Sequence, residues 1–362
     1  MVAAWPAVCL MAAMNRRSIG FRFLLGAALA APAAAAPLPI KVVVVTTYED
    51  DYQNPNATGL TNGEAVRWIR GLGLDRVLPL PAGFRPVRLN ADGVLETMTG
   101  MTTGKAAAST MALGLDPRFD LTHAYWLLAG IAGIDPRQAS LGSAAWAEWV
   151  VDGDIANRID SRELPAGWPD GHIPWDKNTP FESPGTDIGE VYHLNPELVH
   201  WAFERTRGVP IPDSVQMRSF RARFSAFPAA QRPPFVLIGD NLASATYWQG
   251  SRETDWARRW VKLYTHGRGT FTTSSCEDSG FLQALTFLSK SGRVDLSRVL
   301  VLRTASDYCV PAPGVTSAES LQYGTDKAYL AEQEAFEAAY LVGKTVVGEL
   351  VRGWPIYADK VP

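Results

Sequence analysis

Cysteine and histidine are scarce in this 362-residue chain, which contains three cysteines and five histidines. Cys9 falls in a leader-like segment, so Cys276 and Cys309 are left for the rest of the chain, and no CxxC pair is present. The histidines do not cluster with the cysteines, so we expect no zinc site and no metal cofactor. In an oxidising compartment the two cysteines could form a disulfide; otherwise they would be small buried apolar side chains.

Long hydrophobic runs are missing as well. A transmembrane helix takes roughly 20 apolar residues, whereas the run at 23–31 and later ones such as 125–134 and 299–302 are shorter. We therefore expect no membrane span in the mature chain, and a membrane channel is excluded as a property of this chain by itself.

An excess of positive charge is also absent once the N-terminal segment is set aside. Residues 1–36 carry three of the 34 basic residues and none of the 37 acidic ones, so the remainder has a formal net charge of −6. A mildly acidic protein gives nucleic acid no electrostatic attraction. We expect no nucleic-acid partner.

The N-terminus itself has the pattern of an export signal. From Met14 the chain reads Asn15-Arg16-Arg17, then the apolar run 23–31, then four alanines at 33–36. A charged start, a short apolar segment and small residues before a cleavage point are typical of a secretory signal peptide. We predict a signal peptide at 1–36, with Met14 as the true start, and an exported, periplasmic protein.

The rest has ordinary globular composition, with 47% hydrophobic and 20% charged residues in the whole chain. The segments alternate between strand patterns (41–45, 124–129, 235–238, 299–302) and helix patterns (63–70, 104–115, 195–207, 255–265, 279–289, 329–352). This alternation favours an α/β fold, with a mostly parallel mixed central sheet in a single three-layer domain over 37–362. The Pro-, Gly- and Trp-rich stretch 152–191 is predicted to be a long surface excursion over a site.

Ligands of such sheets bind beyond the carboxyl ends of strands, and two predicted strand ends are followed by distinctive runs. Glu49, Asp50 and Asp51 follow strand 41–45 and would hold a general base, bind hydroxyls, or simply form a solvated acidic loop. The small residues 130–133 follow strand 124–129 and allow close approach of a ligand or of a neighbouring helix.

Two further predicted strands are each followed by an acidic residue that could act in a site. Glu277, after Cys276, precedes the helix 279–289, where it either caps the helix or accepts hydrogen bonds from sugar hydroxyls. Asp307, after Ser306, follows strand 299–302 and is either a helix cap or an acid that protonates a leaving group. The sequence leaves these alternatives open.

Taken together, five motifs in chain order resemble the nucleoside phosphorylase and nucleosidase superfamily. They are Gly104-Lys105, Gly130-Ile131-Ala132-Gly133, Gly239-Asp240, Cys276-Glu277 and Ser306-Asp307, and the match spans about residues 40–350. Within that superfamily the closer similarity is to the purine nucleoside permease family. It lies in Gly239-Asp240-Asn241-Leu242, Tyr247-Trp248, Asp255-Trp256-Ala257-Arg258 and Glu277-Asp278.

The resemblance implies a nucleoside phosphorylase-like domain that binds a purine nucleoside and cleaves it through a sugar cation. Asp307 would protonate the purine at N7, with Ser306 positioning it, and Glu277 would hold the ribose hydroxyls. One of Glu49, Asp50 and Asp51 would activate water, and Asp51 aligns best. The other residues that the resemblance places at the substrate are Gly130, Ile131, Ala132, Asp240, Asn241, Tyr247 and Cys276.

The sequence also departs from both enzyme types. It lacks the glycine-aspartate-proline and arginine phosphate loop after the first strand, and an acidic loop there repels phosphate. Hydrolysis is therefore favoured over phosphorolysis; phosphate stays open as a co-substrate and no other cofactor is expected. The family's association with transport leaves a second hypothesis, a non-catalytic periplasmic nucleoside-binding protein that supports uptake. Superfamily relatives often dimerise, so a homodimer is expected by analogy.

Overall fold

A long mixed sheet organises the part of the chain that follows the predicted signal peptide. The computed structural model describes residues 36–51, 62–184, 189–323, 325 and 327–362. The predicted signal peptide and the start at Met14 lie outside these ranges, except for Ala36. Pro37–Pro362 form one compact unit.

Twelve strands hydrogen-bond into this sheet within the described residues. They are β2 (Val42–Thr46), β3 (Arg76–Leu78), β4 (Val87–Leu89), β5 (Val94–Met98), β7 (Tyr125–Ile134), β8 (Ala144–Trp146), β9 (Trp149–Asp152), β12 (Val191–His193), β13 (Val236–Ile238), β14 (Asp240–Ala243), β15 (Phe271–Ser275) and β16 (Val299–Tyr308). The main path runs β12-β9-β14-β15-β7-β2-β5-β4-β3, and β16, β8 and β13 branch from β7 in that order. Two small sheets pair β1 (Leu38–Pro39) with β6 (Phe119–Asp120), and β10 (Ala156–Arg158) with β11 (His172–Pro174).

Most strand pairs in the middle of the sheet are parallel, and the pairs at its two ends are antiparallel. β2 runs parallel to both β5 and β7, and β7 runs parallel to β16. β3, β4 and β12 add antiparallel pairs at the two ends of the main path, and β15 crosses β7 in antiparallel register. The predicted mixed sheet is therefore confirmed, and its parallel centre brings the carboxyl ends of β2, β7 and β16 to one edge.

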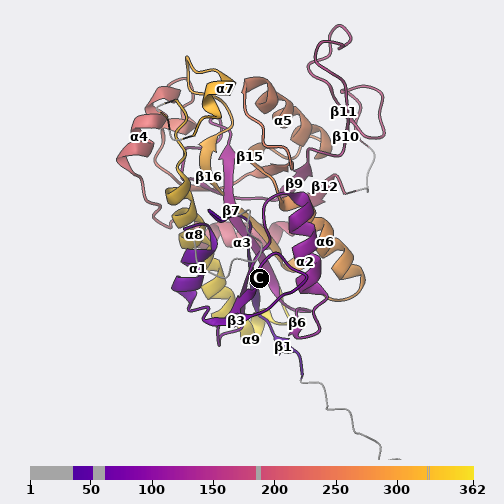
Figure 1. The fold of residues 1–362 in the computed structure, drawn as a ribbon, viewed down its shortest axis with the longest axis vertical. Coiled ribbons are helices and arrows are strands. Elements are labelled where there is room, and N and C mark those ends of the chain that lie inside the picture. The colour runs from indigo at the N-terminus through magenta and orange to yellow at the C-terminus, as the bar shows by residue number, and fades with distance from the viewer. Residues whose placement is uncertain (1–35, 52–61, 185–188, 324, 326) are drawn as a thin grey trace, which may run out of the picture. The chain divides into compact units, whose positions relative to one another are not determined.

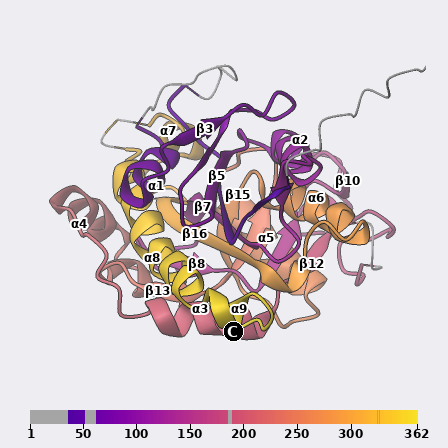
Figure 2. The same ribbon diagram turned by 90° about the horizontal axis from the view of Figure 1, so that it is seen from below.

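Helices cover both faces of the sheet. They are α1 (Ala65–Leu72), α2 (Thr103–Gly114), α3 (Pro196–Thr206), α4 (Val215–Arg221), α5 (Ser251–Tyr264), α6 (Asp278–Lys290), α7 (Ser317–Ser320), α8 (Glu332–Arg352) and α9 (Trp354–Tyr357), with short 3-10 turns at Ala222–Phe224, Ala229–Gln231 and Leu296–Arg298. Figure 2 shows α1 and α8 on one side of the sheet, and α2 and α6 on the other.

Consecutive side chains of β7 show why the fold has three layers. Trp126 packs on Phe281 of α6, with ring centroids 6.2 Å apart. Leu127 points to the opposite face, where it lies beside Gly343 of α8. Because successive side chains of a strand face opposite sides, a strand that is apolar at every position must be covered twice. Every residue of Val42–Thr46 is likewise buried.

Two strands are longer than the sequence predicts. The predicted strands 124–129 and 299–302 continue to Ile134 and Tyr308, so the small residues 130–133, expected after a strand, are part of β7. Likewise, Asp240 of the Gly239-Asp240 motif begins strand β14. These segments pair along their length with one another and with β15, and the ladder partners, which are distant in sequence, keep them extended.

The predicted excursion at 152–191 contains the small β10–β11 sheet, whose described part forms an arm beside β9 and β12 (Figure 1). No helix among the described residues is both long enough and apolar enough to cross a membrane.

Candidate active site

A cavity of about 390 Å³ opens at the strand edge where β2, β7, β15 and β16 end. Its lining comes from segments far apart in the sequence, which the sheet brings together. The residues are Thr47, Tyr48, Glu64, Met101, Thr102, Ile131, Ala132, Gly133, Ala245, Tyr247, Ser274, Ser275, Cys276, Glu277, Ser306, Asp307, Tyr323, Leu330 and Glu332. This is the position at which α/β sheets bind ligands.

A β-bulge places Asp307 in this cavity. The pairing of β16 with β7 shifts between Ala305 and Asp307, so Ser306 is an extra residue on β16. Successive side chains of a regular strand point to opposite faces, but a bulge re-aims them. Ser306 and Asp307 therefore both line the cavity.

The carboxyl group of Asp307 is buried and held by two hydroxyl groups. Ser306 Oγ donates to Oδ1 at 2.8 Å, and the Tyr247 hydroxyl donates to Oδ2 at 3.0 Å. Tyr323 in turn hydrogen-bonds the Tyr247 hydroxyl. Burial raises the pKa of Asp307 to about 6, against a lowering by Ser306. A carboxylic acid with this pKa can keep its proton close to neutral pH.

A second buried acid, Glu277, lies beside a buried arginine. Arg303 is fully buried; its Nη2 donates to Glu277 Oε2 at 2.8 Å and also pairs with Asp278. Burial raises the pKa of Glu277, although Arg303 opposes the shift. Arg303 also fixes the adjacent strand, because its Nη1 donates to the Ile131 carbonyl oxygen at 3.0 Å.

The other Glu277 oxygen faces a strained residue. Thr102 has φ 82° and ψ 154°, a conformation that non-glycine residues rarely adopt, and its backbone N–H donates to Glu277 Oε1 at 3.3 Å. Strain of this kind gathers at functional sites, where the surrounding structure imposes it.

Glu64 is the acid that the sequence reasoning missed. It precedes α1, and its carboxylate accepts backbone N–H groups of Thr47 at 2.6 Å, Tyr48 at 3.0 Å and Ile131 at 2.8 Å. Burial raises its pKa to about 7, and Arg303 and the N–H donors oppose the rise. At the start of a predicted helix a glutamate is typical of a cap, so no local signal distinguished it.

The acidic loop, by contrast, lies outside the described lining of the cavity. Glu49 is buried and accepts the Ala65 N–H at 2.8 Å, so it caps α1. Asp51 pairs with Arg85, and Asp50 is exposed. The structure thus does not bring these three acids to Asp307 and Glu277, and their catalytic assignment stays a prediction.

Other predicted residues divide into lining and support. Ile131, Ala132, Tyr247, Cys276 and Ser306 line the cavity. Asp240 and Asn241 lie away from it. Asp240 Oδ1 accepts the Trp149 N–H at 2.8 Å, and Asn241 Nδ2 donates to Ser275 Oγ at 2.8 Å, so both brace strands.

Gly130 supports the site without lining it. A Cβ atom there would lie 2.5 Å from Arg303 Nη1 and 2.8 Å from Glu64 Oε1. A larger residue would therefore displace both charged groups. Cys276 and Cys309 are both free thiols, so the alternative of a disulfide between them is not realised in the structure.

The described lining of the cavity is rich in carboxylic acids. Four of its lining residues are carboxylic acids, Glu64, Glu277, Asp307 and Glu332, and none of the described lining residues is lysine or arginine. Burial also raises the pKa of Glu332, which lies half-buried at the start of α8. Such a wall favours hydroxyl donors and positive charge, and it disfavours anions.

Solved structures of other proteins share the fold of this chain. The futalosine hydrolase of Helicobacter pylori is 13% identical, with a TM-score of 0.50 over 86% of this chain and 98% of that chain. A 5′-methylthioadenosine/S-adenosylhomocysteine nucleosidase of the same organism is 11% identical, with a TM-score of 0.50 over 86% and 99%. The chain therefore has the nucleoside phosphorylase-like α/β fold.

Sequence comparisons narrow the assignment. The model of the purine nucleoside permease family matches residues 39–362. A protein described as a probable purine nucleoside permease in Schizosaccharomyces pombe is 32% identical over 79% of this chain and 82% of its own length. The purine nucleoside permease of Candida albicans is 28% identical, over 79% of this chain and 72% of its own length. The chain belongs to the purine nucleoside permease family.

Proposed function

We propose that this protein hydrolyses the N-glycosidic bond of purine nucleosides. The observation that carries the proposal is the convergence of three buried acids with raised pKa values, Glu64, Glu277 and Asp307, on one cavity. The names of the related permeases support a purine nucleoside as the ligand, and the solved structures with this fold include a nucleosidase.

Each acid has a distinct role in the proposed reaction. Protonated Asp307 gives its proton to the purine N7 while the bond between the sugar C1′ and the base nitrogen breaks, and the bonding electron pair leaves with the base. Glu277 accepts hydrogen bonds from the ribose hydroxyls, which orients the sugar and favours its developing positive charge. Water forms the new bond to C1′ and loses a proton to ionised Glu64, whose pKa of about 7 suits a general base near neutral pH.

Charge favours water over phosphate as the acceptor. Phosphorolysis would require a phosphate anion beside Glu64 and Glu277, and none of the described lining residues is a lysine or arginine that could neutralise it. Like charges in a partly buried site repel strongly. Neutral nucleosides are therefore the proposed substrates, and export to the periplasm, suggested by the N-terminal pattern, is proposed as the setting.

The test is an assay of base release from inosine, guanosine, adenosine and methylthioadenosine. The reactions are run with and without phosphate, and chromatography detects the free base. We expect release in buffer without phosphate, and we expect Asp307→Asn to lower kcat by roughly 10²- to 10⁴-fold because the proton donor is lost. Glu96→Gln is the matched control, since Glu96 is also a buried acid with a pKa raised to about 7 but lies outside the cavity lining.

Two results would redirect the proposal. Release that depends on phosphate would identify a phosphorylase and contradict the charge argument. Binding of a nucleoside by calorimetry, with no base released, would favour the non-catalytic alternative, in which the protein binds nucleosides for uptake.

A further inference from the structure

A second cavity, of about 280 Å³, shares a wall with the first. The shared wall is the loop 244–249. Ala245 and Tyr247 of this loop line the first cavity, whereas Ser244, Thr246 and Trp248 line the second. Alternate residues of one segment therefore face two different cavities.

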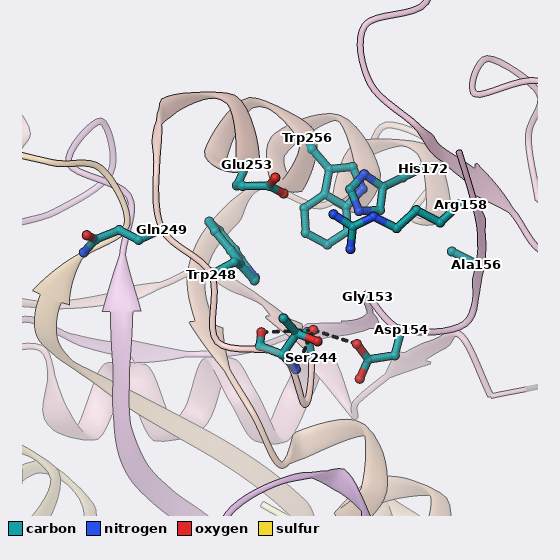
Figure 3. A pocket seen from close by; sticks show the side chains of 11 residues that line it. Gly153, Asp154, Ala156, Arg158, His172, Ser244, Trp248, Gln249, Glu253 and Trp256 are labelled. Carbon is teal, nitrogen blue, oxygen red and sulfur yellow. Dashed lines mark hydrogen bonds between the residues drawn. The ribbon is translucent and has the colours of Figure 1, made fainter. Parts of the chain in front are cut away.

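Aromatic rings form much of the second cavity. Trp248 and Trp256 lie 5.8 Å apart at 77°, and His172 stacks on Trp256 at 4.2 Å. Figure 3 shows Trp248 on one side of the hollow and Trp256, His172 and Arg158 on the other. Flat aromatic faces of this kind are stacking surfaces for planar rings.

Two oppositely charged side chains at the cavity have unused hydrogen-bonding capacity. Within the described residues, the side chains of Arg158 and Glu253 have no hydrogen-bond or ion-pair partner, although both line the cavity. Asp154 differs, because its carboxylate accepts Ser244 Oγ at 2.7 Å and the Ala245 N–H at 2.6 Å. Arg158 is thus a free donor and Glu253 a free acceptor.

We propose that the second cavity binds a nucleobase, that is, a neutral planar heterocycle with donors and acceptors on its edge. Its face stacks on the indole of Trp248, its N–H groups donate to Glu253, and a ring nitrogen or carbonyl oxygen accepts from Arg158. Glu253 and Asp154 disfavour an anion, and Arg158 disfavours a cation, so a neutral ligand fits the charge pattern. The proposal rests on the proposed function in that the released base supplies the ligand.

The position gives the second cavity a direct connection to the first. Tyr247, which hydrogen-bonds Asp307 at 3.0 Å, lies between Thr246 and Trp248 in the shared loop. A base stacked on Trp248 would therefore restrain the residue that holds Asp307.

Hypoxanthine titrated into the full chain by calorimetry tests the proposal. Wild-type protein should bind hypoxanthine at a site that the double variant Arg158→Ala/Glu253→Gln weakens at least tenfold. The matched control is Arg162→Ala, because Arg162 lies on the same arm, pairs with Asp160 and does not line the cavity. Ribose and tetramethylammonium are negative probes.

The two proposals fail separately. Hypoxanthine binding that is the same in the double variant and the wild type would overturn the second site, as would binding of ribose or tetramethylammonium that the double variant abolishes. Base release from nucleosides judges the proposed function independently. Because Arg158 is exposed and Glu253 is half-exposed, the double variant should stay folded. Quenching of tryptophan fluorescence by hypoxanthine gives a second measure of binding at Trp248 and Trp256.

Discussion

At the scale of single residues, burial decides what the acids of this protein can do. Glu64 and Asp51 are carboxylates from the same region of the chain, yet Glu64 is buried with a pKa of about 7, whereas Asp51 is part-exposed and paired with Arg85. Desolvation disfavours the charged form, so Glu64 takes up and releases a proton near neutral pH.

Substitution separates these two acids. Glu64→Gln should lower kcat for base release by roughly 10²- to 10⁴-fold. It should abolish the decline in rate that protonation of Glu64 causes at the acid end of the pH profile, and the decline at the alkaline end, where Asp307 loses its proton, should remain. Asp51→Asn should keep nearly full activity. Rates measured from pH 5 to pH 8 check both, and thermal unfolding confirms that each variant is folded. The opposite ranking would return the role of general base to the acidic loop.

At the scale of elements, α2 and α6 meet at a glycine beneath the cavity. A Cβ atom at Gly280 of α6 would lie 2.0 Å from the backbone oxygen of Thr103. The residue before Thr103 is Thr102, whose backbone N–H donates to Glu277 Oε1 at 3.3 Å. The close approach of two helices therefore sets the position of a strained cavity residue.

Gly280→Ala should push these helices apart. Overpacking of this kind costs about 2 kcal/mol in the free energy of unfolding, and the shift of Thr102 should raise KM for the nucleoside. Gly104→Ala is the control, since a Cβ atom there meets nothing within 4 Å, and this helical substitution should leave stability equal or raise it by about 0.5 kcal/mol. Urea unfolding measures both. Equal stability of the two variants would show that the helices can separate without cost.

At the scale of the whole molecule, buried acids make stability depend on pH. Glu64 and Glu96 have pKa values raised to about 7, and Asp240 and Asp307 to about 6, in each case chiefly by burial. As pH rises from about 4.5 to 7, the unfolded chain loses these protons while the folded chain keeps them, so folding becomes less favourable. Surface pairs such as Asp160 with Arg162 act oppositely at low pH, because the pKa of Asp160 is lowered.

Glu96→Gln should remove part of this pH dependence. Glu96 is buried and accepts Thr46 Oγ1 at 2.9 Å, outside the cavity lining. The variant should match wild type near pH 4.5 and be more stable at pH 8, by at most about 3 kcal/mol for a shift of this size. Thermal unfolding at both values measures the difference. A constant offset between the two proteins at every pH would contradict the raised pKa of Glu96.

Much of the fold was readable from local sequence pattern. Continuous apolar runs such as 41–45 predict buried strands, and helical spacing predicts α2, α5, α6 and α8. Burial of one or two faces of an element repeats apolar residues at a fixed spacing, and this spacing is visible within each segment alone. Polar residues after predicted strands singled out Glu277 and Asp307, and both line the cavity. The family was also correctly identified, from four short stretches between Gly239 and Asp278.

Only the tertiary structure decided which other groups meet those two acids. Arg303 pairs with Glu277 and Asp278, Glu64 bonds the N–H of Ile131, and Asp51 is drawn to Arg85. Each partner comes from a different strand or loop, and strand pairing and the bulge at Ser306 bring them together. The sequence by itself determined the starts of several strands, the longer helices and two of the acids, because these depend on neighbours along the chain. The charge balance and proton affinity of the site depend on burial and on distant partners, which only the folded sheet supplies.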